Sequence, residues 1–288
     1  MNQEDRLPIR LRVDVTNPGQ FFACCGLLEL ADRLWEGAEG WFEDLDSFCM
    51  KPLHTSVDSS LENLLKVAAG VNMRLVDPDN HYSSPIDIES PFSLRLDWWN
   101  DWRSGGIRLK VWAGSMKCHR IARAMQSAMM PHNLDALFDH ETVVYDPIES
   151  DKKVEPFYFD ARRGANALSL DIGFSPDSLQ MMSKAHPAVE LLCLVGLQRF
   201  RPKVTNNSRE FEYSTWPFPL SALVAPLAVC GLMEQNSCCV FRFENAFRTD
   251  QEKHKAFTPA TLLKRGNPLI RPPKTSLITV TDLSGDGV

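Results

Sequence analysis

Two adjacent arginines in the middle of the chain carry the side chains best suited to binding phosphate. Arg162 and Arg163 directly precede Gly164. Guanidinium groups donate paired hydrogen bonds to phosphate oxygens, and glycine lets a backbone approach a ligand closely. We therefore predict that a strand turns here and presents both arginines to a nucleic-acid backbone. The alternative is a solvated turn in which they pair with Asp160 and Asp171.

Further basic residues gather around two predicted turns and one helix end. We predict that they join the arginine pair in one basic surface: Arg199, Arg201, Lys203 and Arg209. A second group lies at three-residue spacings on a predicted helix, where phosphate contact and an ordinary solvated face are equal alternatives: Lys117, Arg120 and Arg123. A third group occupies a polar loop that we expect to touch nucleic acid or a subunit carrying it: Arg248, Lys253 and Lys255.

A tryptophan cluster offers a different kind of contact. Trp98, Trp99 and Trp102 lie in or beside the loop of a predicted hairpin, and Trp112 ends its returning strand. Aromatic rings at such a place stack nucleic-acid bases in some proteins and pack the hairpin in others. Packing is the more common role, and base stacking by the first three tryptophans stays open.

The residue patterns of common enzyme classes are missing from the sequence. It contains no Walker loop, no dinucleotide-binding glycine pattern and no nucleophile turn of the Gly-x-Ser-x-Gly type. Among seven histidines, only His119 and His254 stand beside several cations, where a general base for RNA cleavage would be placed. The adjacent cysteines at 24–25 and 238–239 lack the spacer that lets two sulfurs reach one zinc ion. We predict no catalytic residue, no metal and no cofactor.

Charge is unevenly distributed along the 288 residues, whose formal net charge is −6. Residues 1–159 hold 16 Lys and Arg against 25 Asp and Glu, whereas residues 160–275 hold 15 against 10. Because a local basic patch matters more for nucleic-acid binding than the total charge, the second half is the expected binding half.

Composition also indicates where the protein works. No apolar run approaches the roughly 20 residues that cross a bilayer, and residues 1–6 are polar where a secretory signal is basic and then apolar. Eight cysteines at irregular spacings are too few for a disulfide framework. We expect a cytoplasmic protein with reduced cysteines and no membrane partner.

The elements that must position these residues follow from apolar periodicity and turn signals. The predicted strands are 7–15, 47–53, 92–99, 107–112, 157–163, 167–174, 211–216, 238–243 and 256–263. The predicted helices are 17–35, 60–69, 115–130, an amphipathic helix within 187–203, and 221–233.

Strands and helices in this order predict an α+β fold with a mainly antiparallel sheet, helices packed on one face and an inserted Trp-rich hairpin. A RAMP- or ferredoxin-like core is a candidate arrangement. We predict a single domain, residues 1–265, with an acidic first half, 1–156, and a basic second half, 157–265. A loose C-terminal tail, 266–288, follows it.

Six segments of the sequence together resemble one known protein family. They are residues 13–31, 157–163, 171–175, 188–192, 196–202 and 255–261. With these segments the chain is similar, over nearly its whole length, to the small-subunit family encoded in type I-U (also called I-G or Dpsyc) CRISPR-Cas operons. That family is regarded as a diverged counterpart of the Cascade large subunit.

The resemblance implies a part in RNA-guided DNA interference, as a non-catalytic subunit of a crRNA-guided surveillance complex. The implied partners are crRNA, target DNA, the backbone protein, the fused cap and processing protein, and the helicase-nuclease. In such complexes base pairing reads the target while protein contacts the backbone. We expect the basic half to contact nucleic acid and the acidic half to contact other subunits.

Two alternatives keep the same setting. The first is a crRNA-processing endoribonuclease, although the sequence lacks the Gly-rich loop typical of RNA-binding RAMP proteins. The second is a protein-only scaffold of the same complex without direct nucleic-acid contact.

Overall fold

The computed structural model describes residues 7–54, 58–80, 84–97, 117–163, 184–233, 238–247 and 255–266. Within them lie five α-helices: α1 (Pro18–Leu34), α2 (Leu61–Gly70), α3 (Cys118–Ala128), α4 (Pro187–Arg199) and α5 (Ala225–Val229). Three short 3₁₀ helices are η1 (Pro78–Asn80), η2 (Leu134–Ala136) and η3 (Ala161–Arg163). None of the described helices is both long and apolar enough to span a membrane.

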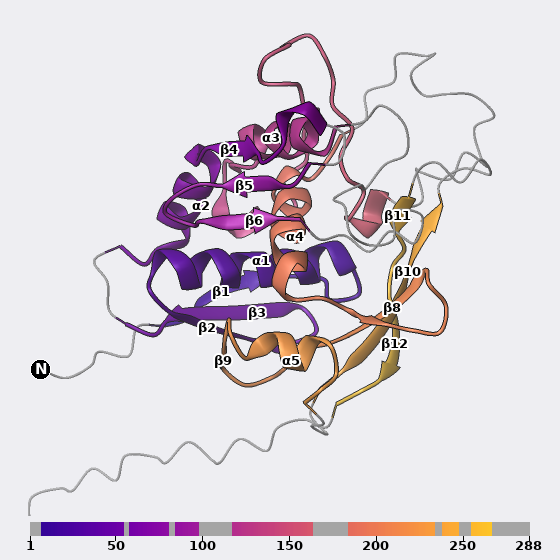
Figure 1. Ribbon diagram of the computed structural model, residues 1–288. Coiled ribbons are helices and arrows are strands. Elements are labelled where there is room, and N and C mark those ends of the chain that lie inside the picture. Colours follow the sequence, from indigo (N-terminus) through magenta and orange to yellow (C-terminus); the bar gives the residue numbers. More distant parts are fainter. Residues whose placement is uncertain are drawn as a thin grey trace, which may run out of the picture.

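The strands of the described residues form three antiparallel sheets, which confirms the α+β class (Figure 1). The first sheet has the order β1 (Ile9–Arg12), β3 (Ser47–Pro52), β2 (Ala38–Asp44), β9 (Leu220–Ser221). The second has the order β11 (Lys255–Phe257), β10 (Val240–Phe247), β8 (Glu210–Ser214), β7 (Lys203–Val204), and β12 (Thr261–Lys264) also pairs with β10. The third contains β4 (Met73–Leu75), β5 (Ile86–Ile88) and β6 (Leu94–Leu96).

The first sheet contains a split βαβ unit. The chain runs from β1 through α1 to β2, and β3 then returns between these two strands, antiparallel to both. This is the opening half of a ferredoxin-like arrangement. In β1 the buried Leu11 alternates with the exposed Arg10 and Arg12, as the sequence pattern predicted. The buried face of this sheet packs against α1.

Helices α1 and α4 form the centre of the fold, and their backbones touch. A Cβ atom added at Gly26 would lie 2.0 Å from the carbonyl oxygen of Leu192, and one added at Gly196 would lie 2.1 Å from that of Phe22. No side chain fits at such a distance, so two glycines set the crossing of the helices. Figure 1 shows α4 crossing α1 between the first and third sheets.

The expectation of an amphipathic helix after residue 187 is wrong in one respect. Every residue of α4 from Pro187 to Gln198 is buried, so the helix has no solvated face. The reason is that α1, α3 and β6 all pack around it. The prediction that α1 belongs to the core is confirmed, because it is buried from Pro18 to Ala31.

An aromatic cluster joins α1 to the first and second sheets. Phe21 stacks on Phe42 with 5.0 Å between ring centroids and lies 4.3 Å from the ring of Tyr213. The buried polar atoms are satisfied: Tyr213 Oη donates to Val15 O at 2.7 Å, and Trp216 Nε1 donates to Gly40 O at 2.7 Å. The first bond ties β8 to the residues that follow β1, and the second ties the segment after β8 to β2.

The strand expected at 157–163 is absent. Tyr158 has a φ of 62°, which breaks an extended conformation, and η3 begins three residues later. The aromatic side chains of Phe157 and Phe159 are buried in the core rather than alternating across a sheet. The apolar pattern of residues 157–163 therefore predicted correctly that the aromatic side chains are buried, but it predicted the wrong backbone conformation.

Other expected elements differ in length or position. The helix expected at 221–233 is reduced to α5, because Pro226 lies in its first turn and Gly231, with a φ of 75°, follows its end. Five of the described strands were not predicted: β2, β4, β5, β7 and β9. The strand expected at 167–174 and the returning strand at 107–112 lie outside the described residues, as does the loop of the Trp-rich hairpin.

Candidate functional site around Asp160

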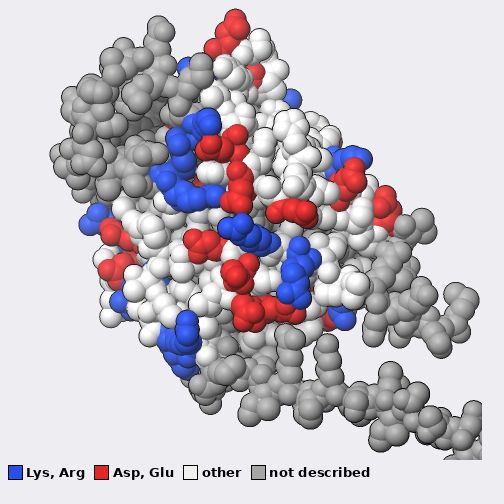
Figure 2. Space-filling model, turned by 180° about the vertical axis from the view of Figure 1, so that it is seen from behind, with Lys and Arg blue, Asp and Glu red and all other residues white. Residues whose placement is uncertain are grey.

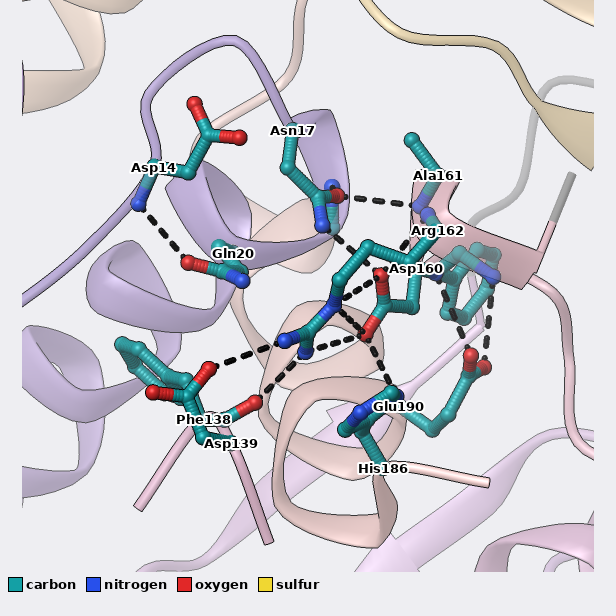
Figure 3. A network of polar contacts seen from close by, with 12 residues as sticks. Asp14, Asn17, Gln20, Phe138, Asp139, Asp160, Ala161, Arg162, His186 and Glu190 are labelled. Atoms are coloured by element: carbon teal, nitrogen blue, oxygen red, sulfur yellow. Dashed lines mark hydrogen bonds and ion pairs between the residues drawn. The ribbon is translucent and has the colours of Figure 1, made fainter. Parts of the chain in front are cut away.

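The N-termini of α1 and α4 meet η3 in a buried polar cluster, which we call the Asp160 junction (Figure 3). Asn17 caps α1, and its Oδ1 accepts hydrogen bonds from Gly19 N at 3.1 Å and Ala161 N at 3.0 Å. Its Nδ2 donates to Asp160 Oδ1 at 2.7 Å. One asparagine thus caps a helix and holds a segment 143 residues further along the chain.

Arg162 closes the Asp160 junction from the outside. Its Nε and Nη2 donate to the two carboxylate oxygens of Asp160 at 3.0 and 2.7 Å. Its remaining donors reach Asp139 Oδ1 at 2.9 Å and Phe138 O at 2.5 Å. The geometry is therefore that of the alternative interpretation, in which the arginine pairs with Asp160. Asp171 lies outside the described residues.

Two further titratable groups complete the Asp160 junction. His186 Nδ1 lies 3.0 Å from Asp160 Oδ2. Glu190 accepts backbone hydrogen bonds from Phe159 N and Asp160 N, both at 3.2 Å. These contacts hold the irregular segment before η3 against the first turn of α4.

The two buried carboxyl groups have opposite pKa shifts. Burial, reinforced by the negative charge of Asp160, raises the pKa of Glu190 to about 8, although backbone N–H groups act against this. Burial also penalises the Asp160 carboxylate, but its contacts with His186 and Arg162 outweigh burial and hold its pKa well below the usual range. Asp160 is therefore an anion, while Glu190 holds its proton up to weakly basic pH.

This arrangement anchors segments rather than presenting a reactive group. Asp160 and Glu190 are fully buried, and both oxygens of each carboxyl group already accept from partners within the chain. A catalytic carboxylate has to reach a substrate proton within hydrogen-bond distance. The chemistry available to the Asp160 junction is thus internal ion pairing and proton uptake.

The raised pKa of Glu190 predicts a pH-dependent stability. An unfolded glutamate titrates near pH 4.3. Between that pH and about 8 the folded chain therefore holds a proton that the unfolded chain lacks. Stability should fall as the pH rises through this window, by up to about 1.4 kcal/mol per pH unit. Glu190→Gln should remove that slope in urea unfolding at pH 5, 6, 7 and 8.

Glu141→Gln is the matched control, because Glu141 is half exposed and its hydrogen bond from Lys184 lowers its pKa. It should leave the slope between pH 5 and 8 unchanged. A wild-type stability that is flat over this range would contradict the assignment of the titrating group.

A second buried carboxylate lies near the opposite end of the helix pair. Glu29 on α1 is fully buried; Arg33 Nε donates to its Oε1 at 2.6 Å, and Arg199 Nε lies 2.7 Å from its Oε2. Arg33 also donates to the carbonyl oxygens of Phe92 and Ser93. Arg199, predicted to face nucleic acid, therefore ties the C-terminal end of α4 to α1.

The remaining predicted cations fall into several environments. Arg120 is bound by Asp146 Oδ2 and Glu149 Oε1, each at 2.6 Å. Lys203 and Arg209 are more loosely paired, with Glu212 at 3.5 Å and Glu244 at 4.0 Å. Arg201 is exposed after α4, and its Nε donates to Gln198 O at 3.2 Å. The other cations have these positions: Arg163 is half-buried beyond Asp160, Lys117 is the N-cap residue of α3, Arg123 is half-buried on α3, and Lys255 is buried at the start of β11.

The predicted basic surface is divided by α4. Arg162 and Arg163 lie at the end where α4 begins, whereas Arg199, Arg201 and Lys203 lie at the end where it finishes. A helix of 13 residues separates these ends by about 20 Å. Figure 2 shows basic and acidic side chains interleaved over the face behind the view of Figure 1. Nucleic-acid binding by these residues stays a prediction.

Several sequence candidates have no described structure. Six of them lie outside the described residues: Arg248, Lys253, Trp98, Trp99, Trp102 and His254. His119 is described: its Nε2 lies 3.4 Å from Met73 O, and burial lowers its pKa. Within the described ranges, no group of three or more His, Cys, Asp or Glu residues is placed to hold a metal ion.

The sequence reasoning missed the residues that organise the Asp160 junction. Asn17 was recognised as part of a helix start, but its bonds to residues 160 and 161 were not. Glu190 is the single carboxylate of α4, and Glu29 is flanked by apolar residues on both sides within α1. An isolated charge in such a helix signals a buried, partnered group, because burial without a partner is costly.

Comparisons with known proteins give no relative. No family model, no curated protein and no solved structure matches this chain.

Proposed function

We propose that the chain is a non-catalytic subunit of a type I-U/I-G crRNA-guided surveillance complex, and that it acts through its surfaces during recognition of target DNA. The proposal begins from the resemblance of six sequence segments to the small-subunit family of these operons. One observation carries it further: the described members of that set meet in space.

The contacts among these segments are close. A Cβ atom added at Gly19, in residues 13–31, would lie 2.4 Å from the carbonyl oxygen of Phe159, in residues 157–163. The first segment also meets α4 at the touching glycines. Residues 255–261 donate backbone hydrogen bonds to both of these segments. Phe257 N donates to Tyr158 O at 3.0 Å, in residues 157–163, and Ala260 N donates to Thr16 O at 2.7 Å, in residues 13–31. Interlocking of the described segments that carry the likeness supports a shared fold, and a shared fold leaves the function to be carried by surfaces.

A nucleic-acid contact is best supported near β7 and β8. Lys203 is 60% exposed, and its nearest acidic partner is 3.5 Å away. Arg209 is 42% exposed, and its Nη1 lies 4.0 Å from Glu244 Oε1. Exposed ion pairs of this kind contribute little to stability, so phosphate oxygens can replace the carboxylates at small cost. Arg162, Arg199 and Arg120 differ, because they hold buried carboxylates in place.

Membership in the complex is tested by purification from the native operon. A tagged chain expressed with all neighbouring genes should retain crRNA and the backbone protein through size-exclusion chromatography. Recovery of the chain free of both would overturn the proposal. An altered crRNA end in a deletion strain, restored by the wild-type chain, would favour the endoribonuclease alternative instead.

The nucleic-acid contact predicts a change in salt dependence. Replacing Arg201, Lys203 and Arg209 by alanine should weaken binding of target DNA by the assembled complex. The slope of log K against log salt should fall by roughly 0.7–0.9 for every phosphate contact that is lost. Lys66→Ala is the control, because Lys66 is an exposed cation on α2, 63% accessible and paired with Glu62. It should leave the slope unchanged.

The protein-only scaffold is the second candidate function. The observation in its favour is the pairing of Arg162, Arg199 and Arg120 with carboxylates of the chain itself. Under this alternative the triple variant binds DNA with the wild-type slope while the chain still co-purifies with the complex. Those two measurements together separate the two candidates.

A further inference from the structure

One stretch of the chain carries no charge at all. The 21 residues 213–233 contain no Lys, Arg, Asp, Glu or His. They run from the end of β8 through β9 and α5, and their inner side chains belong to the core. Trp216, Ala222, Ala225 and Val229 are fully buried there. The absence of charge is therefore explained for the inner side of this segment only.

The outer side of the same segment is apolar too. Leu223 is 71% exposed, Leu227 is 47% exposed, Leu232 is 72% exposed, and Val224 is exposed beside them. Hydrogen bonds keep these residues on successive turns: Leu227 N donates to Val224 O at 3.0 Å, and Leu232 N donates to Leu227 O at 2.9 Å. We call these four side chains the α5 patch. Helix α5, which carries the patch, lies beside β9 at the lower edge of the fold in Figure 1.

The α5 patch differs from the rest of the described surface. Other large apolar side chains that are strongly exposed, such as Leu7 and Ile148, belong to segments that also contain charged residues. Scattered apolar side chains are normal on a protein surface, whereas contiguous ones mark an interaction site. Covering the α5 patch would remove apolar area from water at about 25 cal/mol per Å².

We propose that the α5 patch is a self-association surface, on which a second copy of this chain docks with its own α5 patch. A two-fold interface brings the same residues together from both copies. In such an interface a charged patch would meet the same charge on the other copy and be repelled. The α5 patch contains no charged side chain, so docking two copies brings no like charges together and buries no unpaired charge. Nucleic acid is excluded as the occupant, because the segment offers phosphate no cation. This inference does not depend on the proposed function.

Charge inserted into the α5 patch tests the proposal. Leu227→Glu with Leu232→Glu would place four carboxylates in a two-fold interface, and both sites are exposed, so the fold should tolerate them. In sedimentation velocity of the full chain, we expect the wild type to dimerise at micromolar concentration. The double variant should dissociate on the order of 100-fold more readily. Ile148→Glu, at a site 77% exposed on another part of the surface, should behave as wild type.

Cys230 supplies an independent readout of what covers the α5 patch. It is partly exposed at the end of α5, and its Sγ lies 3.6 Å from Leu227 O. In the wild type, labelling of Cys230 by a maleimide should slow as the protein concentration rises. In the double variant the labelling rate should not depend on concentration. Peptide mapping distinguishes Cys230 from the other partly exposed cysteine, Cys239.

Three results would overturn the proposal. If the wild-type chain stays monomeric at all concentrations and its Cys230 is labelled fast, the α5 patch is free and is not a self-association surface. A monomer that labels slowly even at high dilution covers the patch with its own chain. A dimer that survives the double variant, verified as folded by circular dichroism, uses another surface.

Discussion

Gly196→Ala should destabilise the protein by more than about 3 kcal/mol, at or beyond the upper end of the range for overpacked cores. The added methyl group would lie 2.1 Å from the carbonyl oxygen of Phe22 and 2.7 Å from Gly26 N. Both are backbone atoms of α1, which cannot rotate away as a flexible side chain does. The two central helices would have to separate, and every contact along them would loosen. Urea unfolding followed by tryptophan fluorescence measures the loss.

Gly70→Ala is the control for that variant. Gly70 is the last residue of α2, and a Cβ atom built there meets nothing within 4 Å. Alanine is favoured over glycine in a helix by up to about 1 kcal/mol, so this variant should be neutral or slightly stabilising. A loss below about 1 kcal/mol for Gly196→Ala would show that the helices do not touch as described.

Asp160→Asn should cost about 3–5 kcal/mol, the range for removing one partner of a buried ion pair. The variant keeps the shape of the side chain but removes the charge that Arg162 and His186 face. It also places an amide nitrogen where Asn17 Nδ2 or Arg162 now donates. The half-buried guanidinium would be left with the exposed Asp139 as its remaining carboxylate partner.

Asp139→Asn separates the buried interaction from the exposed one. Asp139 binds the same arginine at 2.9 Å, but its side chain is 53% exposed. Its replacement should cost about 1 kcal/mol or less, as for other exposed pairs. Equal losses for Asp160→Asn and Asp139→Asn would mean that burial at the Asp160 junction contributes little.

Local sequence patterns predicted much of the fold because the relevant physics was local. The alternation around Leu11 predicted β1, and the Asn17–Pro18 pair marked the start of α1. The pattern of 157–163 was misleading, since alternating aromatic residues are buried equally well by an irregular segment that Glu190 holds through backbone bonds. In β2, acidic and glycine residues hid a strand that pairing with β3 stabilises.

The Asp160 junction shows why only part of the candidate site was predictable. Arg162 and Asp160 are two residues apart, so their pairing was a natural local alternative. Asn17 and Glu190 reach the same aspartate from 143 and 30 residues away, and no local pattern indicates such contacts. Arg199 pairs with Glu29, which lies on a different helix, so no local pattern could show that this arginine is bound within the chain.

The connection between β1 and α1 is held by segments that are synthesised much later on the ribosome. Val15 O accepts from Tyr213 Oη, and Thr16 O accepts from Ala260 N, so this connection meets these partners only after residue 260 has been made. At roughly 5–20 residues per second, about 260 residues take on the order of 13–50 s to make. During that time the apolar surface of α1 is incompletely covered. The nascent chain should therefore be a client of ribosome-associated chaperones until residue 260 has left the exit tunnel.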